Sequence, residues 1–263
     1  MALTPSSAVP KDAHMSVETI YDDYWTKRRR VSGEWDLCRL QRVFGPLLGS
    51  EKVLDYGCGI GTTYRSLLIS KVGSYSGADV SQVALKTVTT ANQPGFSINP
   101  DDSSIPAASG SFDGVCSIEV FEHLFDPLAA ARELFRLLQP GGTLVATVPN
   151  FGYHAWRLMA LIRAQVPAEP ERPQENRYNG VHIRFFSAAT FRRLFQDAGF
   201  VDVTISSFDD SSIFDVTRGF GPFAKISDLA RAHLPAALQL RFLQDVWPAL
   251  FAYRIRVVAV KAG

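Results

Sequence analysis

The sequence has little cysteine, no excess of charge of either sign and no long apolar run. Its 263 residues include three cysteines, Cys38, Cys58 and Cys116, which cannot form a fully paired disulfide framework, so we expect a reducing compartment. Lys and Arg number 27 against 26 Asp and Glu, which gives no electrostatic reason to expect a nucleic-acid partner. No stretch approaches the roughly 18 apolar residues of a membrane-spanning helix. The N-terminus also lacks the apolar segment of a secretory signal. These absences predict a cytoplasmic protein without a transmembrane segment.

The composition predicts a folded chain, because hydrophobic residues make up 46% and charged residues 20% of it. We divide the chain into a mobile tail over 1–15, an N-terminal helical cap over 16–48 and a larger domain over 49–263. Two insertions are expected in that domain, at about 151–186 and 207–250. Insertions of this length often form lids or specificity surfaces.

From residue 51 onward, short apolar runs alternate with amphipathic segments. The expected strands are 53–56, 75–80, 96–99, 113–118, 143–148, 201–206 and 253–260. The main helices expected between them are 62–70, 82–92, 127–138 and 188–198. Such alternation favours parallel strands joined by crossover helices. The sequence therefore predicts an α/β fold, a doubly wound Rossmann-like sheet of seven mostly parallel strands with helices on both faces.

The segment Val53-Leu-Asp-Tyr-Gly-Cys-Gly-Ile-Gly61 joins a buried strand to a glycine-rich turn. Glycines at 57, 59 and 61 allow the backbone to approach a ligand, and a helix that follows would direct its free N–H groups to the same place. The dinucleotide pattern G-x-G-x-x-G is not met, because the third glycine comes one residue early. Alone, the segment fits either a plain tight turn or an atypical dinucleotide loop.

Acidic side chains follow the next three predicted strands. Asp79 ends the second strand, where a carboxylate can accept both hydroxyls of a ribose. Asp101 and Asp102 follow the third strand and suit an adenine amino group, and Glu119 begins the segment EVFEH after the fourth. All of these residues lie at the carboxyl ends of parallel strands, where open α/β sheets bind their ligands.

Together these segments resemble the class I S-adenosylmethionine-dependent methyltransferases, and within them the branch of ubiquinone-type O-methyltransferases (methyltransferase type 11/12 domain). The matching segments are VLDYGCGIG, GADVS, DDSSIPAASGSFD, SIEVFEHL and LLQPGGTLVATVPN, followed by HIRFFSAATFRRLFQDAGF. The combined pattern is specific for the cofactor and the fold and not for the substrate.

The resemblance implies an enzyme of class EC 2.1.1.- with S-adenosyl-L-methionine as cofactor. It implies that Asp55 and the three glycines hold the methionine end of this cofactor, that Asp79 holds the ribose and that Glu119 closes the pocket floor. The full set of implied cofactor-binding residues is Asp55, Gly57, Cys58, Gly59, Gly61, Asp79, Val80, Asp101, Asp102, Ser103 and Glu119. The acceptor is expected to be a small molecule methylated at a hydroxyl oxygen, with transfer to carbon or nitrogen, or a non-catalytic binding protein, as alternatives.

A hydroxyl acceptor needs a base, and histidine is the usual residue for this task. His123 follows the fourth strand, and His182 opens the family-like segment at the end of the first insertion. Each is interpreted either as a catalytic residue or as a structural hydrogen-bonding residue. No group of His, Cys and carboxylate residues has metal-ligand spacing, so the sequence predicts no metal site. Asp22 and Asp23 fit a surface pair more simply.

Aromatic residues outside these motifs suggest how the pocket is covered. Tyr24 or Trp25 is expected to cap the cofactor, and the basic run 27–30 fits an anion site, a solvated helix face or a localisation signal. Trp156 and the stretch 234–251 could form an apolar acceptor lid, pack on the sheet or contact a membrane surface. Nothing in the sequence indicates an oligomeric state.

Overall fold

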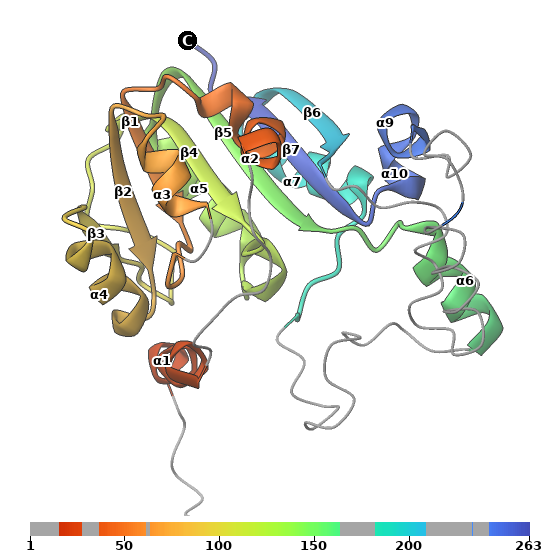
Figure 1. The fold of residues 1–263 in the computed structure, drawn as a ribbon, viewed down its shortest axis with the longest axis horizontal. Coiled ribbons are helices and arrows are strands. Elements are labelled where there is room, and N and C mark those ends of the chain that lie inside the picture. The colour runs from red at the N-terminus through yellow and green to blue at the C-terminus, as the bar shows by residue number, and fades with distance from the viewer. Residues whose placement is uncertain (1–15, 28–36, 62–63, 164–181, 209–232, 234–241) are drawn as a thin grey trace, which may run out of the picture.

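A computed structural model describes residues 16–27, 37–61, 64–163, 182–208, 233 and 242–263 of the chain. Its centre is a seven-stranded sheet with the strand order β3-β2-β1-β4-β5-β7-β6 (Figure 1). The strands are β1 Lys52–Tyr56, β2 Ser74–Asp79, β3 Gly95–Ser97, β4 Phe112–Ile118, β5 Leu138–Pro149, β6 Val201–Ser207 and β7 Arg254–Val260. Only β7 runs against its neighbours, β5 and β6. The predicted mostly parallel, Rossmann-like sheet is confirmed.

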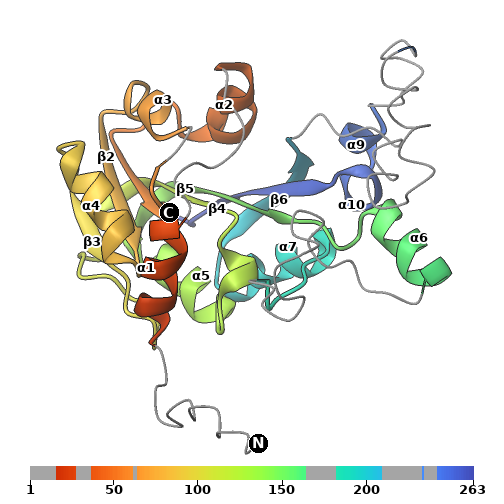
Figure 2. The same ribbon diagram turned by 60° about the horizontal axis from the view of Figure 1, so that its bottom comes forward.

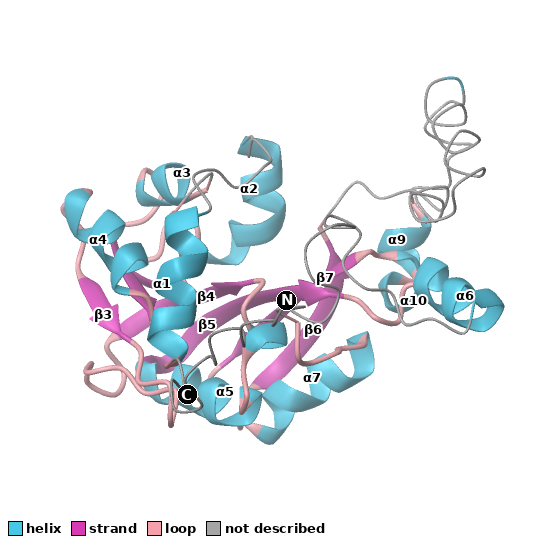
Figure 3. Cartoon of the chain, turned by 90° about the horizontal axis from the view of Figure 1, so that it is seen from below, coloured by secondary structure: helices cyan, strands magenta, loops and turns pink. Residues whose placement is uncertain are grey.

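Helices cover both faces of this sheet. The helices of the described residues, on these faces and beyond the sheet, are α1 Val17–Lys27, α2 Leu37–Phe44, α3 Arg65–Ile69, α4 Gln82–Thr90, α5 Pro127–Leu137, α6 His154–Arg163, α7 Ala188–Asp197, α9 Leu243–Val246 and α10 Pro248–Phe251. Two short 3-10 turns are η1 Gly45–Leu47 and η2 Phe121–His123. Figure 3 shows α2, α3 and α4 on one face and α5 and α7 on the other. Each face has its own apolar core.

Local sequence signals fix where several helices begin. Ser81, just before the predicted helix 82–92, is the N-cap of α4, because its side chain accepts a hydrogen bond from the amide of Ala84. Asp126 caps α5 in the same way and Pro127 occupies the first turn, where its missing N–H costs no hydrogen bond. The largest difference from prediction concerns β5. This strand starts at Leu138 and not at the predicted residue 143, because Leu138 already pairs with Phe112 of β4. The pairing register then shifts between Phe112 and Gly114.

Helix α1 lies beyond the carboxyl ends of the parallel strands, beside α4 (Figures 1 and 2). Asp22 joins the two helices, because its Oδ1 accepts hydrogen bonds from Ser81 Oγ at 2.5 Å and from the amide of Val83 at 3.2 Å. Asp22, expected to belong to a turn or surface pair, thus lies in a helix, is partly buried and also makes a contact between two helices. The N-terminal cap is attached to the first turn of α4, at the edge of the sheet where ligands are expected.

Parts of the predicted organisation fall outside the described residues. The tail over 1–15 and the basic residues 28–30 are not described, and the two insertions are described only at 151–163, 182–186, 207–208, 233 and 242–250. The division into tail, cap and domain stays a prediction. Within the described ranges, no helix is long and apolar enough to cross a membrane.

Candidate active site

The glycine turn after β1 approaches its neighbours too closely for side chains. Gly57, Gly59 and Gly61 all have positive φ angles, of 76°, 53° and 70°. A Cβ atom on Gly59 would lie 2.7 Å from the Trp25 ring of α1. Glycine is thus needed at this position both for the left-handed backbone and for the close contact.

Arg65 supports this turn from within the protein. Its side chain is buried, and its Nη2 donates to the carbonyl oxygens of Cys58 at 3.2 Å and Gly59 at 2.8 Å. Nη1 donates to Thr87 Oγ1 at 2.9 Å, and Nε donates to the Tyr75 hydroxyl at 3.2 Å. One guanidinium therefore fixes the turn to β2 and α4. The helix expected to follow the turn directly begins only at Arg65, and residues 62–63 lie outside the described part.

Asp55 lies beneath the glycine turn and has no exposed surface. Its carboxylate accepts hydrogen bonds from the hydroxyls of Tyr75 at 2.7 Å and Tyr64 at 3.1 Å, and from the Cys116 thiol at 3.5 Å. Burial raises the pKa of Asp55, while the Tyr75 hydrogen bond and the nearby Arg65 charge act in the opposite direction. At this depth the carboxylate organises the residues around the turn.

Asp79 ends β2 and is the acidic group best placed for a ribose. Its Oδ2 accepts from the amide of Gly59 at 2.8 Å, and its Oδ1 accepts from the amide of Ser81 at 2.9 Å. Burial, as the largest cause, raises the pKa of Asp79 to about 6. A carboxylate has about four acceptor positions, so the two backbone donors leave capacity for two hydroxyl groups. The site thus fits the ribose of an adenosyl cofactor. Its neighbour Val80 packs, partly buried, against the core.

The loop after β3 carries the residues expected beside the adenine. Asp101 and Asp102 are exposed, and Asp102 Oδ1 accepts from the amide of Ser104 at 3.0 Å. Hydrogen bonding to the Ser104 side chain, and then to its amide, lowers the pKa of Asp102. Ser103 has a positive φ of 64°, and its carbonyl accepts a 2.8 Å hydrogen bond from the Tyr56 hydroxyl. Tyr56, which is larger than the residues common at this point of the motif, thus holds the loop to β1.

Glu119 follows β4 and is held by the two strands beside it. Its Oε1 accepts from Thr147 Oγ1 at 3.0 Å, and its Oε2 lies 3.1 Å from Arg254 Nε at the start of β7. A positive φ of 56° at Glu119 turns the chain into η2. Glu119 therefore forms part of the floor at the strand ends, fixed between β5 and β7.

Both candidate histidines lie beside Glu122, whose carboxylate is buried. The distance to Glu122 Oε1 is 3.9 Å from His123 Nε2 and 3.8 Å from His182 Nε2. The two imidazole rings meet edge to face with their centroids 4.8 Å apart. The structure thus brings together two residues that are 59 positions apart in the sequence, around an acid that sequence reasoning did not select.

Aromatic residues of α1 cover this edge of the sheet. Trp25 packs on Gly59, and Tyr24 meets Trp25 edge to face at 4.9 Å. Burial raises the pKa of Tyr21 to about 12, with smaller contributions from the charges of Asp79 and Glu122. The Tyr21 hydroxyl is therefore within reach of the charges of Asp79 and Glu122. Nε1 of Trp25 is buried without a hydrogen-bond partner among the described residues.

Comparison with known proteins agrees with this geometry. A family model for the methyltransferase domain matches residues 24–205, more than half of the chain. The chain belongs to the class I S-adenosylmethionine-dependent methyltransferases. The enzyme class EC 2.1.1.- and S-adenosyl-L-methionine as methyl donor are thereby confirmed.

Relatives of this methyltransferase are spread over several functions. It is 27% identical over 244 residues to a probable S-adenosylmethionine-dependent methyltransferase of Mycolicibacterium smegmatis, covering 91% of this chain and 84% of that protein. It is 26% identical to a ubiquinone biosynthesis O-methyltransferase of Idiomarina loihiensis, covering 66% and 69%. A Haloferax volcanii methyltransferase solved with the Trm112 activator shares the fold, with a TM-score of 0.52, 19% identity and coverage of 92% and 98%.

Trp156 of the methyltransferase belongs to an aromatic group near the start of β7. Its ring lies 4.5 Å from that of Phe151 and 5.3 Å from that of Tyr253. Phe151 also contacts Phe185 at 4.3 Å, and Phe185 follows three residues after His182. The residue predicted to be a lid therefore connects through aromatic contacts to the segment that carries a candidate catalytic histidine.

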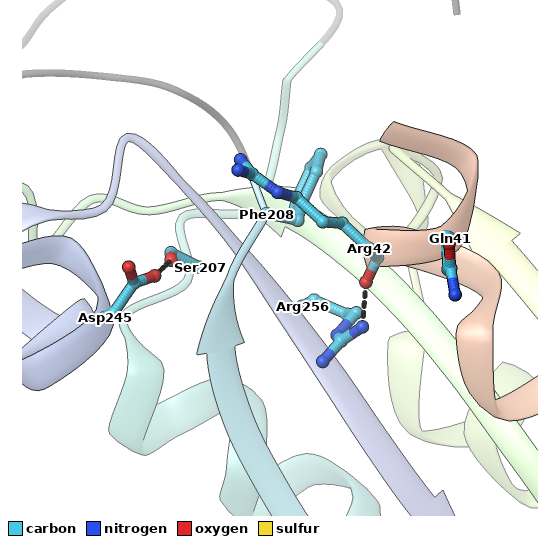
Figure 4. A pocket seen from close by; sticks show the side chains of 6 residues that line it. All are labelled: Gln41, Arg42, Ser207, Phe208, Asp245 and Arg256. Atoms are coloured by element: carbon cyan, nitrogen blue, oxygen red, sulfur yellow. Dashed lines mark hydrogen bonds between the residues drawn. The ribbon is translucent and has the colours of Figure 1, made fainter. Parts of the chain in front are cut away.

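A separate cavity of about 340 Å³ lies between α2 and the β6–β7 edge (Figure 4). It is lined by Gln41, Arg42, Ser207, Phe208, Asp245 and Arg256. Its polar groups bond to each other: Ser207 Oγ donates to Asp245 at 2.7 Å, and Arg256 donates to the carbonyl of Arg42. None of these residues belongs to the glycine turn or to the histidine group, so the cavity is not part of the candidate active site.

Proposed function

We propose that this methyltransferase transfers the methyl group of S-adenosylmethionine to a hydroxyl oxygen of a small-molecule acceptor, as the ubiquinone-type branch does. Two features support transfer to oxygen: the similarity to a ubiquinone biosynthesis O-methyltransferase and two imidazoles gathered at the end of β4. When bound, the cofactor supplies an electrophilic methyl group on a sulfonium. The protein must then position the acceptor and remove its proton, and positioning alone can contribute several kcal/mol.

The observation that carries the cofactor part of this proposal is the carboxylate of Asp79, held by two backbone amides under α1. We assign it to the ribose hydroxyls, and the turn containing Gly57, Cys58, Gly59 and Gly61 to the methionine end. Asp55 supports this turn through Tyr64 and Tyr75. Val80, Asp101, Asp102 and Ser103 border the adenosine, and Glu119 closes the floor.

For the acceptor, we propose that His123 and His182 take up the proton of the hydroxyl group. A neutral imidazole next to a buried carboxylate is a suitable base, because the negative charge of Glu122 stabilises the imidazolium that forms. Trp25 and Tyr24 cap the cofactor, and the buried Nε1 of Trp25 offers it a hydrogen bond. Trp156 covers the acceptor side.

Calorimetry with S-adenosylhomocysteine tests the cofactor site. The wild type should bind, whereas Asp79→Ala should lose binding while its circular dichroism spectrum remains that of a folded protein. A matched control is Asp245→Ala, since Asp245 lies in the separate cavity and its loss should leave cofactor affinity unchanged. Normal binding by Asp79→Ala would show that the ribose carboxylate is another residue.

The acceptor is tested with a methyl-labelled cofactor and a set of phenols, alcohols, amines and carbon acids. Label on oxygen supports the proposal, and label on carbon or nitrogen contradicts it. Absence of any methylated small molecule, in cell extract as well, would favour a binding protein without turnover. For a true acceptor, His123→Ala and His182→Ala should lower kcat by about 10²–10⁴-fold with little change in cofactor affinity.

A further inference from the structure

The group formed by Glu122, His123 and His182 has the composition of a metal site. All three ligand atoms lie within 4.8 Å of one another. The Glu122 carboxylate is 2% exposed and the two histidine side chains are about one-fifth exposed, so the group is shielded but can be reached from solvent. Two imidazoles and one carboxylate are a common protein ligand set for zinc, with one position left open.

The fold holds these three side chains in place through backbone contacts. The amides of Ile183 and Arg184 both donate to the carbonyl oxygen of Glu122, at 2.9 and 3.0 Å. The Arg184 guanidinium also donates to the carbonyl oxygens of Leu124 and Phe125. The segment that carries His182 is thus fixed against η2 by main-chain bonds.

We propose that Glu122, His123 and His182 bind a single divalent cation, with Zn²⁺ as the best-matched ion. A tetrahedral zinc with bonds of about 2.1 Å holds its ligand atoms roughly 3.4 Å apart. The separations of 3.8 and 3.9 Å between each Nε2 and Glu122 Oε1 would need to shorten by about 0.5 Å, and the two histidine nitrogens, which lie within 4.8 Å of each other, by up to about 1.4 Å. A dication also offsets the desolvation of the buried carboxylate, a cost that two neutral imidazoles compensate less well.

This inference refines the acceptor step and rests on the proposed function for its chemical role. An acceptor hydroxyl at the open coordination position becomes more acidic, as water does on zinc. Its O–H bond breaks and the proton passes to solvent, because both imidazoles then serve as ligands; with the cation bound, the metal replaces the base role proposed above for the metal-free histidines. The oxygen lone pair then forms the O–CH₃ bond as the S–CH₃ bond breaks.

Metal binding can be measured without any acceptor. Full-length protein treated with EDTA and dialysed is titrated with ZnCl₂ by calorimetry, and with CoCl₂ by visible absorption. We expect one ion per chain, with the intense absorption of four-coordinate cobalt. His182→Ala and His123→Ala should each weaken zinc binding by about 100-fold or more. His233→Ala is the control, because His233 is exposed and lies outside the group.

Glu122→Gln is a third test, and His182→Ala replaces it if the buried substitution prevents folding. No stoichiometric zinc binding by the wild type, or unchanged binding by His182→Ala, would overturn the proposal. Binding of S-adenosylhomocysteine to the EDTA-treated protein is measured in parallel. If the cofactor binds and zinc does not, the metal inference fails while the proposed function stands. If neither binds, both fail.

Discussion

The raised pKa of Asp79 leads to a quantitative prediction for cofactor binding. Ribose hydroxyls donate hydrogen bonds, so they bind the ionised carboxylate in preference to the protonated one. With a pKa of about 6 in the cofactor-free protein, Asp79 is largely protonated at pH 5. Affinity for S-adenosylhomocysteine should then be about tenfold lower at pH 5 than at pH 7.5, because each pH unit below the pKa costs a factor of ten.

The raised pKa of Asp79 also makes the stability of the folded protein depend on pH, in a direction that can be worked out. The folded protein binds this proton more tightly than the unfolded chain, in which the carboxyl keeps its ordinary pKa of 3.8. The contribution of Asp79 to the free energy of unfolding therefore falls as the pH rises from about 4 to 6. Once the group is ionised, the loss amounts to about 3 kcal/mol, as an upper estimate from the shift. Hydrogen bonds from the two ribose hydroxyls of the cofactor should restore part of this lost free energy of unfolding.

The assay is calorimetry between about pH 5 and 7.5, in buffers with different ionisation enthalpies, which counts protons exchanged on binding. We expect nearly one proton to be released per cofactor at the acid end. Asp79→Asn is the control, since it should bind weakly at every pH without this release. Two results would refute the reasoning: a pH-independent affinity in the wild type, or equal proton release by the variant.

Three further predictions concern the glycine turn and the attachment of α1 to α4. Arg65→Met should lower the free energy of unfolding by about 2–4 kcal/mol in urea denaturation, because two buried carbonyls lose their donor, and it should weaken cofactor binding. The same substitution at exposed Arg193 should change neither, and equal stability of both variants would contradict the role given to Arg65. Gly59→Ala should destabilise by at least about 1–2 kcal/mol, from its left-handed backbone, and by less in a Trp25→Ala background, where the collision is absent. If Gly59→Ala lowers the free energy of unfolding equally in both backgrounds, the contact with the Trp25 ring contributes nothing to its effect. Asp22→Ala should cost about 1 kcal/mol at neutral pH and less in acid, where the wild-type carboxyl also loses its charge. An unchanged denaturation midpoint at neutral pH would show that Asp22 does not attach α1.

The sheet was predictable because its signals are local. Each strand has its own apolar run, and the glycines and acids that follow β1 and β2 mark the strand ends. The position of β5 was less predictable, since its first residues depend on pairing with β4 rather than on their own composition. Ser81 shows that a helix start can be marked by a single capping residue, whereas the cap Asp126 was not foreseen.

The site was predicted only where its residues belong to motifs next to the strands. Arg65 was missed because its main partners are backbone carbonyls, which leave no trace in the sequence. Glu122 and His182 meet because the segment after β5 returns to the end of β4, a path that spacing along the chain does not reveal. The contact of Asp22 was missed for the same reason, since its partner Ser81 lies 59 positions away.

The placement of α1 has a consequence for turnover. Its residues contact the glycine turn and the start of α4. If α1 caps the cofactor as proposed, spent cofactor can leave past Trp25 only after this helix moves away. Detachment of α1 would then limit the turnover rate, as in enzymes whose product release is slower than their chemistry.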